Sequence, residues 1–175
     1  MHYPVVNRNG TIITSAVTNL DIHDMSRAAK TYGVNSFYIV TPLADQQQLV
    51  GKITSHWTKG VGAEYNPLRR KALELIKIKS SLNEAAEDIY KKDGLAPKIV
   101  VTSSKNFEPQ LSMDNFRKML QNSGGYLLLF GTAWGFTEEF IGAADYRLEP
   151  LKGCTGYNHL SVRSAAAIIL DRLLS

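Results

Sequence analysis

The alternation of short apolar runs with segments of helical spacing constrains the fold of this chain more than any other feature. The run GTIITSAV at residues 10–17 is rich in β-branched side chains and predicts a buried strand. Residues 21–33 have apolar side chains near helical spacing and predict a helix that ends at Gly33. Residues 34–42 predict the next strand, which ends at Pro42. This strand–helix–strand order predicts parallel pairing in an α/β sheet flanked by helices.

Helix-start and helix-stop signals extend the same pattern to the end of the chain. Asn66 and Pro67 predict a helix that continues to about residue 78. The sequence SLNE at residues 81–84 is a capping box, and Gly94 ends the helix that it begins. With no internal repeat or linker, the sequence predicts one mostly parallel α/β domain spanning residues 1–175. Further helices are expected at residues 43–60, 113–122 and 160–174, and further strands at residues 98–104, 125–131 and 145–150.

Composition and cysteine content exclude several classes of protein. Hydrophobic residues make up 44% of the chain and charged residues 21%, as in ordinary globular domains. The apolar runs are shorter than the ~18 residues of a membrane span, and the first residues lack the apolar core of a signal peptide. Cys154 is the only cysteine, which excludes an internal disulfide and a multi-cysteine zinc site, and no metal-binding motif is present. We therefore expect a cytoplasmic protein that binds neither a metal nor a membrane.

Loops rich in small and polar residues follow three of the predicted strands in the C-terminal half. They include Thr102–Ser104, Gly131–Gly135 and Leu148–Ser161. Ligands bind beyond the carboxyl ends of strands in open α/β sheets, so these loops are expected to converge on one site. The spacing of Gly131 and Gly135 does not match the dinucleotide-binding pattern, and no Walker phosphate loop is present. A Rossmann dehydrogenase and a kinase are therefore poorly supported, and for any single loop simple turn formation is the alternative.

Four segments, in order along the chain, carry a resemblance to a known family. They are TNLDIHDMSRAAKTYGV at residues 18–34, HWTKGVGAEYNPLR at 56–69, LLLFGTAWGF at 127–136 and LEPLKGCTGYNHLSVRSAAAIILDRL at 148–173. Over essentially its whole length the chain resembles SPOUT-superfamily RNA methyltransferases, and more narrowly a small bacterial group similar to the C-terminal domain of tRNA (guanine) methyltransferases. The resemblance implies an α/β fold with a C-terminal trefoil knot.

The same resemblance implies that S-adenosylmethionine (SAM) binds in a bent shape between the three loops. A neutral adenine requires an apolar slot edged by backbone donors and acceptors, and glycines allow the backbone to approach closely. The slot is expected from Leu129, Phe130, Leu151 and Leu160, and either Asn158 or Ser161 is expected to cap the last helix. The residues assigned to the cofactor are Thr102, Ser103, Phe130, Gly131, Thr132, Gly135, Leu148, Leu151, Gly153, Tyr157, Asn158, Leu160 and Ser161.

Catalytic groups are less apparent in the sequence than the cofactor loops. In the ribose-methylating branch of the superfamily, an N-terminal asparagine–arginine motif places an arginine near the target, and Asn19 and Arg27 resemble it. Arg27 is the catalytic candidate, with a surface ion pair to Asp24 as the alternative. In the guanine-methylating branch an aspartate acts as the base, and Asp21 or Asp24 is the candidate here. Base and ribose methylation both stay open.

A basic segment between residues 52 and 79 predicts a surface for RNA. Lysine and arginine far outnumber acidic residues there, and Trp57 and Tyr65 are interleaved with them. Phosphates attract basic clusters and unstacked bases stack on aromatic rings, although a solvated helix face has much the same charge. The resemblance adds a homodimer, because in the superfamily the partner subunit completes the site. The expected phosphate contacts are Arg69, Arg70 and Lys71.

The sequence thus predicts a SAM-dependent methyltransferase that acts on structured RNA such as tRNA or rRNA. One alternative is a non-catalytic RNA- or nucleotide-binding module that retains the knotted fold. A different α/β nucleotide-binding enzyme is the other, and it would lack the knotted C-terminal crossing.

Overall fold

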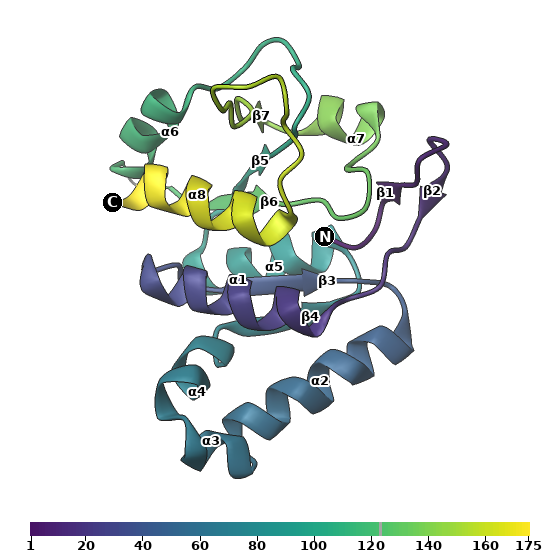
Figure 1. Cartoon of the computed structure of the whole chain (residues 1–175). Coiled ribbons are helices and arrows are strands. Elements are labelled where there is room, and N and C mark those ends of the chain that lie inside the picture. Colours follow the sequence, from purple (N-terminus) through teal and green to yellow (C-terminus); the bar gives the residue numbers. More distant parts are fainter. Residues whose placement is uncertain (123) are drawn as a thin grey trace.

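The structure, a computed structural model, describes residues 1–122 and 124–175 (Figure 1). Most helices begin at a serine or threonine whose hydroxyl accepts a hydrogen bond from the main-chain N–H three residues later, as at Ser81, Ser112 and Ser161. The helices are α1 (Asn19–Thr31), α2 (Ala44–Thr58), α3 (Val61–Tyr65), α4 (Pro67–Leu73), α5 (Leu82–Asp93), α6 (Met113–Leu120), α7 (Glu138–Ala143) and α8 (Val162–Leu174). The strands are β1 (Val5–Val6), β2 (Ile12–Ile13), β3 (Phe37–Val40), β4 (Ile76–Lys79), β5 (Lys98–Val101), β6 (Tyr126–Leu129) and β7 (Tyr146–Arg147).

The strands form two parallel groups and one antiparallel hairpin. β3 pairs with β4, and β5 lies between β6 and β7. All of these pairings are parallel, whereas β1 and β2 pair antiparallel. The carboxyl ends of β5, β6 and β7 therefore meet at one edge of their sheet, which is where α/β sheets bind ligands.

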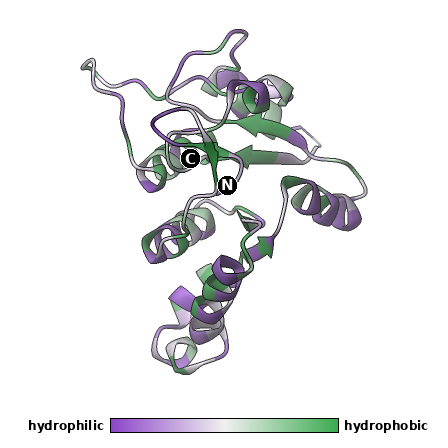
Figure 2. Ribbon diagram, turned by 90° about the vertical axis from the view of Figure 1, so that its right-hand side faces the viewer, coloured by the Kyte–Doolittle hydropathy of each residue, from purple (hydrophilic) through white to green (hydrophobic). Residues whose placement is uncertain are grey.

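Side chains alternate along β5 so that both faces of the three-stranded sheet are covered. Val100 is buried on one face with Phe116 of α6 and Ile169 of α8. Val101 is buried on the other face, in the cluster that contains Ala85 of α5. Hydrophobic strands are accordingly enclosed by helices that carry hydrophilic residues on their surface (Figure 2). Within the part of the chain that the structure describes, no helix combines the length and the apolar character that crossing a membrane requires.

Helix α1 joins a lobe made of α2, α3 and α4 to the C-terminal half of the molecule. The lobe lies below α1 in Figure 1, and α8 lies directly above α1 and in contact with it. Ile22 of α1, Val50 of α2 and Leu73 of α4 are fully buried in one apolar cluster together with Ile39 of β3. This cluster fixes the lobe on the β3–β4 pair.

The two parallel groups face each other across an apolar cavity. β3 and β6 are edge strands of their sheets, and both line a cavity of about 210 Å³ that α1, α5 and α8 also border. The first residues of the chain connect the two groups at their carboxyl ends. Met1 N donates to Phe130 O at 2.8 Å, and His2 N donates to Val40 O at 2.9 Å. The parallel strands that the structure describes therefore make two adjacent sheets rather than one continuous sheet.

The structure confirms the α/β class, the parallel pairing and most of the expected elements, and it corrects two of them. Residues 10–17 contribute only β2, and their partner is β1 rather than residues 34–42; Ile12 is 53% exposed, so this segment is no buried strand. The helix expected from Pro67 to about residue 78 ends at Leu73, and Ile76–Lys79 form β4 instead. Parallel pairing with β3 and packing of the two isoleucines of β4 against the lobe cluster outweigh the helical spacing there. Helices α3 and α7 and strand β1 were not expected.

Candidate active site

The loops after β5, β6 and β7 surround a cleft of about 750 Å³. Residues 102–107 form one side, residues 130–136 the second, and residues 158–163 the third. The remaining wall comes from residues 15–21, which lead into α1. The volume lies in the range of roughly 300–1,000 Å³ that small-molecule sites have. The expectation that the three loops converge is therefore confirmed.

Most of the residues that the sequence assigned to a cofactor lie together in this cleft. Three of them do not line it. Leu148 is only 3% exposed and packs in the core with Val100, because its strand-end position points it into the sheet face. Gly153 and Tyr157 lie on the outer part of the third loop, where Tyr157 is 73% exposed. The predicted residues that do line the cleft are Thr102, Ser103, Phe130, Gly131, Thr132, Gly135, Leu151, Asn158, Leu160 and Ser161; Leu129 is buried on the α5 side of the sheet.

The loop Gly131–Gly135 is held in shape by main-chain hydrogen bonds to β1. Val6 N–H donates to Gly135 O at 2.9 Å, and Trp134 N–H donates to Val6 O at 3.0 Å. Ala133 has a φ of 53° and Gly135 a φ of 91°, both in the left-handed region. A Cβ at Gly131 would lie 3.1–3.2 Å from the ring of Phe136, so a larger residue at this position would crowd the ring.

Side chains of the third loop fasten it to its neighbours. Asn158 Nδ2 donates to Ser104 O at 3.1 Å, which joins the third loop to the first. The Glu149 carboxylate accepts a hydrogen bond of 2.6 Å from Met113 N at the start of α6. Ser161 rather than Asn158 caps α8, since its hydroxyl accepts from Ser164 N. Polar side chains in this loop thus order the wall of the cleft.

A chain of hydrogen-bonded side chains lies along the wall that precedes α1. The hydroxyls of Ser15 and Thr132 bond to each other, and Ser15 Oγ lies 3.1 Å from Nδ1 of His2. Burial lowers the pKa of His2 to about 4, so its ring is neutral at pH 7. The wall therefore offers hydroxyl groups without a positive charge from His2.

The ion pair between Asp21 and Arg163 is the most notable polar feature that the cleft contains. Arg163 Nη1 donates to Asp21 Oδ1 at 2.9 Å, and its Nε lies 3.5 Å from Asp24 Oδ2. Asp21 and Arg163 line the cleft, and the Asp21 side chain is only 10% exposed, whereas that of Asp24 is 50% exposed. Titratable groups that are buried beside a charged partner in a cleft are typical of active sites. Asp21 was a sequence candidate; Arg163 was missed, although its place in the first turn after the third loop was a usable signal.

Arg27, the sequence candidate for catalysis, lies apart from the cleft of its own chain. It is exposed on α1 and does not line the cavity. Asp24, the partner expected for it, is bound by Arg163. The arginine that the fold brings to the cleft is therefore Arg163, from the opposite end of the sequence.

The basic residues of α4 have different surroundings, all on the lobe below α1. The guanidinium of Arg69 lies 4.6 Å from the ring centre of Trp57, which occupies it in packing. Arg70 Nε bonds to Glu74 at 2.8 Å, and Lys71 is exposed. Lys71 is thus the most accessible of the three.

Residues 1–122 and 124–175 contain no obvious set of ligands for a metal ion. No group of three or more histidine, cysteine, aspartate or glutamate side chains is arranged there to hold a metal ion.

Sequence comparison places the whole chain in one family. The model of a family described as SAM-dependent RNA methyltransferase matches residues 1–175. The chain is 42% identical over 174 residues to a tRNA (guanine-N(1)-)-methyltransferase of Oleidesulfovibrio alaskensis, a match that covers 99% of this chain and 40% of that protein. It is 36% identical over 176 residues to a protein of Aquifex aeolicus named only as uncharacterized, with 100% of this chain and 86% of that protein covered. The chain thus spans less than half the length of the named methyltransferase.

Comparison with solved structures supports the same fold. The SpoU methyltransferase AviRb from Streptomyces viridochromogenes, in complex with AdoMet, aligns with a TM-score of 0.57 at 15% identity. The alignment covers 91% of this chain and 56% of that one. At this level of identity the likeness concerns the fold alone.

Proposed function

The chain belongs to the family of SAM-dependent RNA methyltransferases, and on that premise we propose that it transfers a methyl group from SAM to a structured RNA. The observation that carries the proposal is the cleft at the carboxyl ends of three parallel strands, with the Asp21–Arg163 pair in its wall. The name of the relative in Oleidesulfovibrio alaskensis makes tRNA the first substrate to test. Base and ribose are both possible acceptors.

The residues of the cleft fit a bound SAM molecule. Phe130, Leu151 and Leu160 line the cleft and offer an apolar slot for adenine. The hydrogen bonds of the loop to β1 hold backbone groups in fixed positions for a polar ligand edge. When bound, SAM supplies an electrophilic methyl group on its sulfonium.

Asp21 and Arg163 are proposed to serve the methyl acceptor. A ring N–H, an exocyclic amine or a hydroxyl that gains a methyl group must release a proton, and a carboxylate in the cleft wall can accept it. Arg163 Nη1 binds Oδ1 of Asp21, and we assign the proton to Oδ2. Arg163 thereby acts as a positioning residue for Asp21. Its positive charge can also attract the phosphates of the RNA backbone.

The proposal also includes how the chain is organised. Residues 1–175 act as one domain with a C-terminal trefoil knot, in which the third loop lies next to the first, as the Asn158–Ser104 hydrogen bond requires. Two copies form a homodimer. Light scattering on a size-exclusion column measures the mass of this assembly. RNA phosphates bind along the lobe at Lys71 and Arg70, with Arg69 restricted by Trp57. Arg27, exposed on α1, acts on the RNA or in the partner's cleft.

Isothermal titration with SAM tests the cofactor site. Replacement of Leu160 by glutamate places a charge in the apolar slot, and we expect it to abolish measurable binding. Leu49→Glu is the matched control, since Leu49 is 42% exposed on α2 and Leu160 is 46% exposed in the cleft. Absence of binding to the unaltered protein at millimolar SAM would exclude the enzyme.

Transfer of a radioactive methyl group to unfractionated tRNA tests the reaction itself. Digestion of the product and mass analysis of its nucleosides then identifies the base or ribose that carries the methyl group. A protein that binds SAM but transfers nothing to tRNA or rRNA is the non-catalytic module that the sequence left as the alternative.

A further inference from the structure

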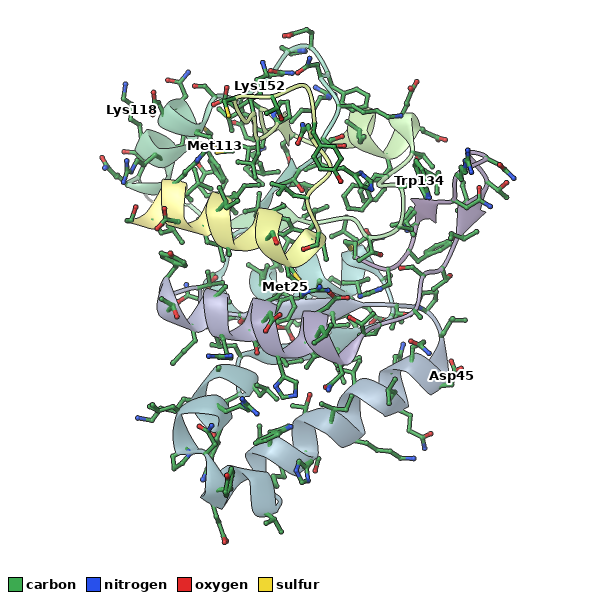
Figure 3. The ribbon with its side chains drawn as sticks, in the orientation of Figure 1. Met25, Asp45, Met113, Lys118, Trp134 and Lys152 are labelled. Atoms are coloured by element: carbon green, nitrogen blue, oxygen red, sulfur yellow. The ribbon has the colours of Figure 1, made fainter. Side chains whose placement is uncertain are left out.

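Trp134 stands at the edge of the proposed active site with most of its side chain in solvent. It is 58% exposed and lines the cleft, and it lies between the α7 region and the β1–β2 hairpin (Figure 3). Large aromatic side chains lose a favourable burial when they stay in water. An exposed indole in a cleft is therefore a candidate for binding a ligand.

The backbone around Trp134 is fixed at an energetic cost. Ala133, directly before it, has a φ of 53°, which is unfavourable for a residue with a Cβ. The loop keeps this conformation because Trp134 N–H and Gly135 O both bond to Val6 of β1. Strained residues that their surroundings hold in place cluster at functional sites. Here the strained residue directly precedes the exposed indole.

An aromatic ring from the third loop approaches Trp134. The ring centres of Trp134 and His159 are 6.2 Å apart and their planes are tilted by 44°. Tyr157 lies edge-on behind His159, with 6.4 Å between ring centres. Trp134 and His159 both line the cleft, while Tyr157 does not. Two loops thus contribute rings to one rim.

Trp57 shows what a tryptophan with a packing role looks like in the same protein. It is covered by Arg69 at 4.6 Å, and the rings of His23 and His56 meet it edge-on at 5.4 and 5.2 Å. Its side chain also packs against the lobe cluster. Among the described residues, Trp134 has one aromatic neighbour, the tilted ring of His159, and it is 58% exposed.

We infer that Trp134, with His159 beside it, is a stacking platform for an unpaired nucleobase of the RNA at the mouth of the cleft. The inference rests on the proposed function, because it concerns the substrate of the same site. A base that is to react must leave its stack, and aromatic side chains replace the lost stacking without a requirement for sequence. Trp134 is a positioning residue, because it holds the RNA strand while another group in the cleft reacts.

Fluorescence measures stacking on Trp134 directly. The chain has two tryptophans, so Trp57→Phe leaves Trp134 as the only indole. We expect a single-stranded adenylate 12-mer to quench the tryptophan emission of this variant. In the otherwise unaltered protein, we expect Trp134→Phe to retain most of the affinity for the oligonucleotide, measured by the anisotropy of a labelled 12-mer. Failure of the 12-mer to quench Trp134 would overturn the inference. Because this readout requires neither SAM nor turnover, it is independent of a failure of the proposed function.

Kinetics with tRNA complete the test. In Trp134→Ala we expect KM for unfractionated tRNA to rise roughly 5- to 150-fold, the equivalent of one lost base–aromatic stack, with kcat within about twofold. SAM affinity by titration stays unchanged. If SAM affinity falls as much as KM rises, the indole belongs to the cofactor site; if the mass of the assembly halves, it belongs to a subunit contact. Either result overturns the inference, and an unaltered protein that binds no SAM overturns the proposed function instead.

Discussion

The two parallel strand groups end in very different ways. After β3 and β4 the chain enters α2 and α5 within a few residues, 41–43 and 80–81. Thr41 is fully buried, its N–H donates to Lys79 O, and its carbonyl accepts from Gln47. After β5, β6 and β7 the connections are long, at residues 102–112, 130–137 and 148–161, and they surround the cleft.

The difference teaches that strand pairing alone does not create a site. Both groups are parallel and both present carboxyl ends, but only the second leaves room beyond them. In the first group polar atoms at the two strand ends bond to each other, as Thr41 N–H does with Lys79 O. In the second group, Asp21 and Arg163 bond to each other and still line open space. Connection length and polar groups that border a cavity therefore distinguish a binding edge from a structural edge.

Asp21→Asn has the largest expected effect, because it alters the polar pair of the open edge. We expect kcat for tRNA methylation to fall by about 10²- to 10⁴-fold, the usual contribution of a general base. SAM affinity changes little, since the amide keeps the shape and an acceptor oxygen for Arg163. Asp24→Asn is the matched control, because Asp24 touches the same arginine at 3.5 Å outside the cleft. Equal losses in the two variants would contradict a role of Asp21 in proton transfer.

A designed strand between the two groups tests whether they are halves of one sheet. Five apolar residues placed ahead of Met1 are designed to run parallel to β3 and β6 and to enter the cavity of about 210 Å³ that Met1 lines. We expect the free energy of unfolding in urea to rise by about 2–5 kcal/mol, from the volume filled and the edges paired. We also expect slower hydrogen exchange of the backbone amides of β3 and β6. An extension of equal length with two prolines is the control, since proline has no N–H to donate; equal stabilisation by both would refute strand pairing.

Gly131→Ala probes how tightly the open edge is packed. The added Cβ would lie 3.1–3.2 Å from the Phe136 ring, so the ring or the loop has to shift. We expect a loss of about 1–3 kcal/mol in unfolding free energy, together with weaker SAM binding. Gly153→Ala serves as the control, because nothing lies within 4 Å of a Cβ there. A fully stable Gly131→Ala protein with unchanged SAM affinity would show that the loop tolerates displacement.

Local signals in the sequence predicted the elements well, and long-range contacts explain where they did not. Ser81, Ser112 and Ser161 cap helices as their spacing indicates, because a cap depends on residues three positions apart. Residues 76–79 became a strand because β3, distant in sequence, offers a parallel partner. No periodicity within a short window contains that information.

The site was predictable to a similar extent and for a similar reason. Its three loops follow from strand ends rich in small residues, and most assigned residues line the cleft. Arg163 was missed because its partner Asp21 lies 142 positions earlier, and only the packing of α8 on α1 joins them. Leu148 was assigned to the cofactor although it packs in the core. The sequence around a strand end does not distinguish a leucine that faces the cleft from one that faces the core.

Substitution of Asp88 has the smallest expected effect, a pH-dependent one, and it concerns the β3–β4 group. Its carboxylate accepts hydrogen bonds from Lys77 at 2.6 Å, Lys79 at 2.9 Å and Tyr38 at 2.6 Å, which join α5 to β3 and β4. These partners, Lys77 foremost, hold the pKa of Asp88 far below its usual range. A depressed folded-state pKa stabilises the fold fully above the unfolded value of about 4, and this stabilisation is lost as the pH falls below it.

We therefore expect Asp88→Asn to lower the free energy of unfolding by about 1 kcal/mol at pH 7. The gap to the unaltered protein shrinks below pH 4, as the aspartate of the unaltered protein takes up a proton on unfolding. Urea titrations at pH 7, 5 and 3 measure this gap. Glu87→Gln is the control, because Glu87 lies in the same helix, is 67% exposed and is 3.9 Å from its lysine. A gap that stays constant down to pH 3 would mean that the shape of Asp88, and not its charge, stabilises the packing of α5 on the β3–β4 group.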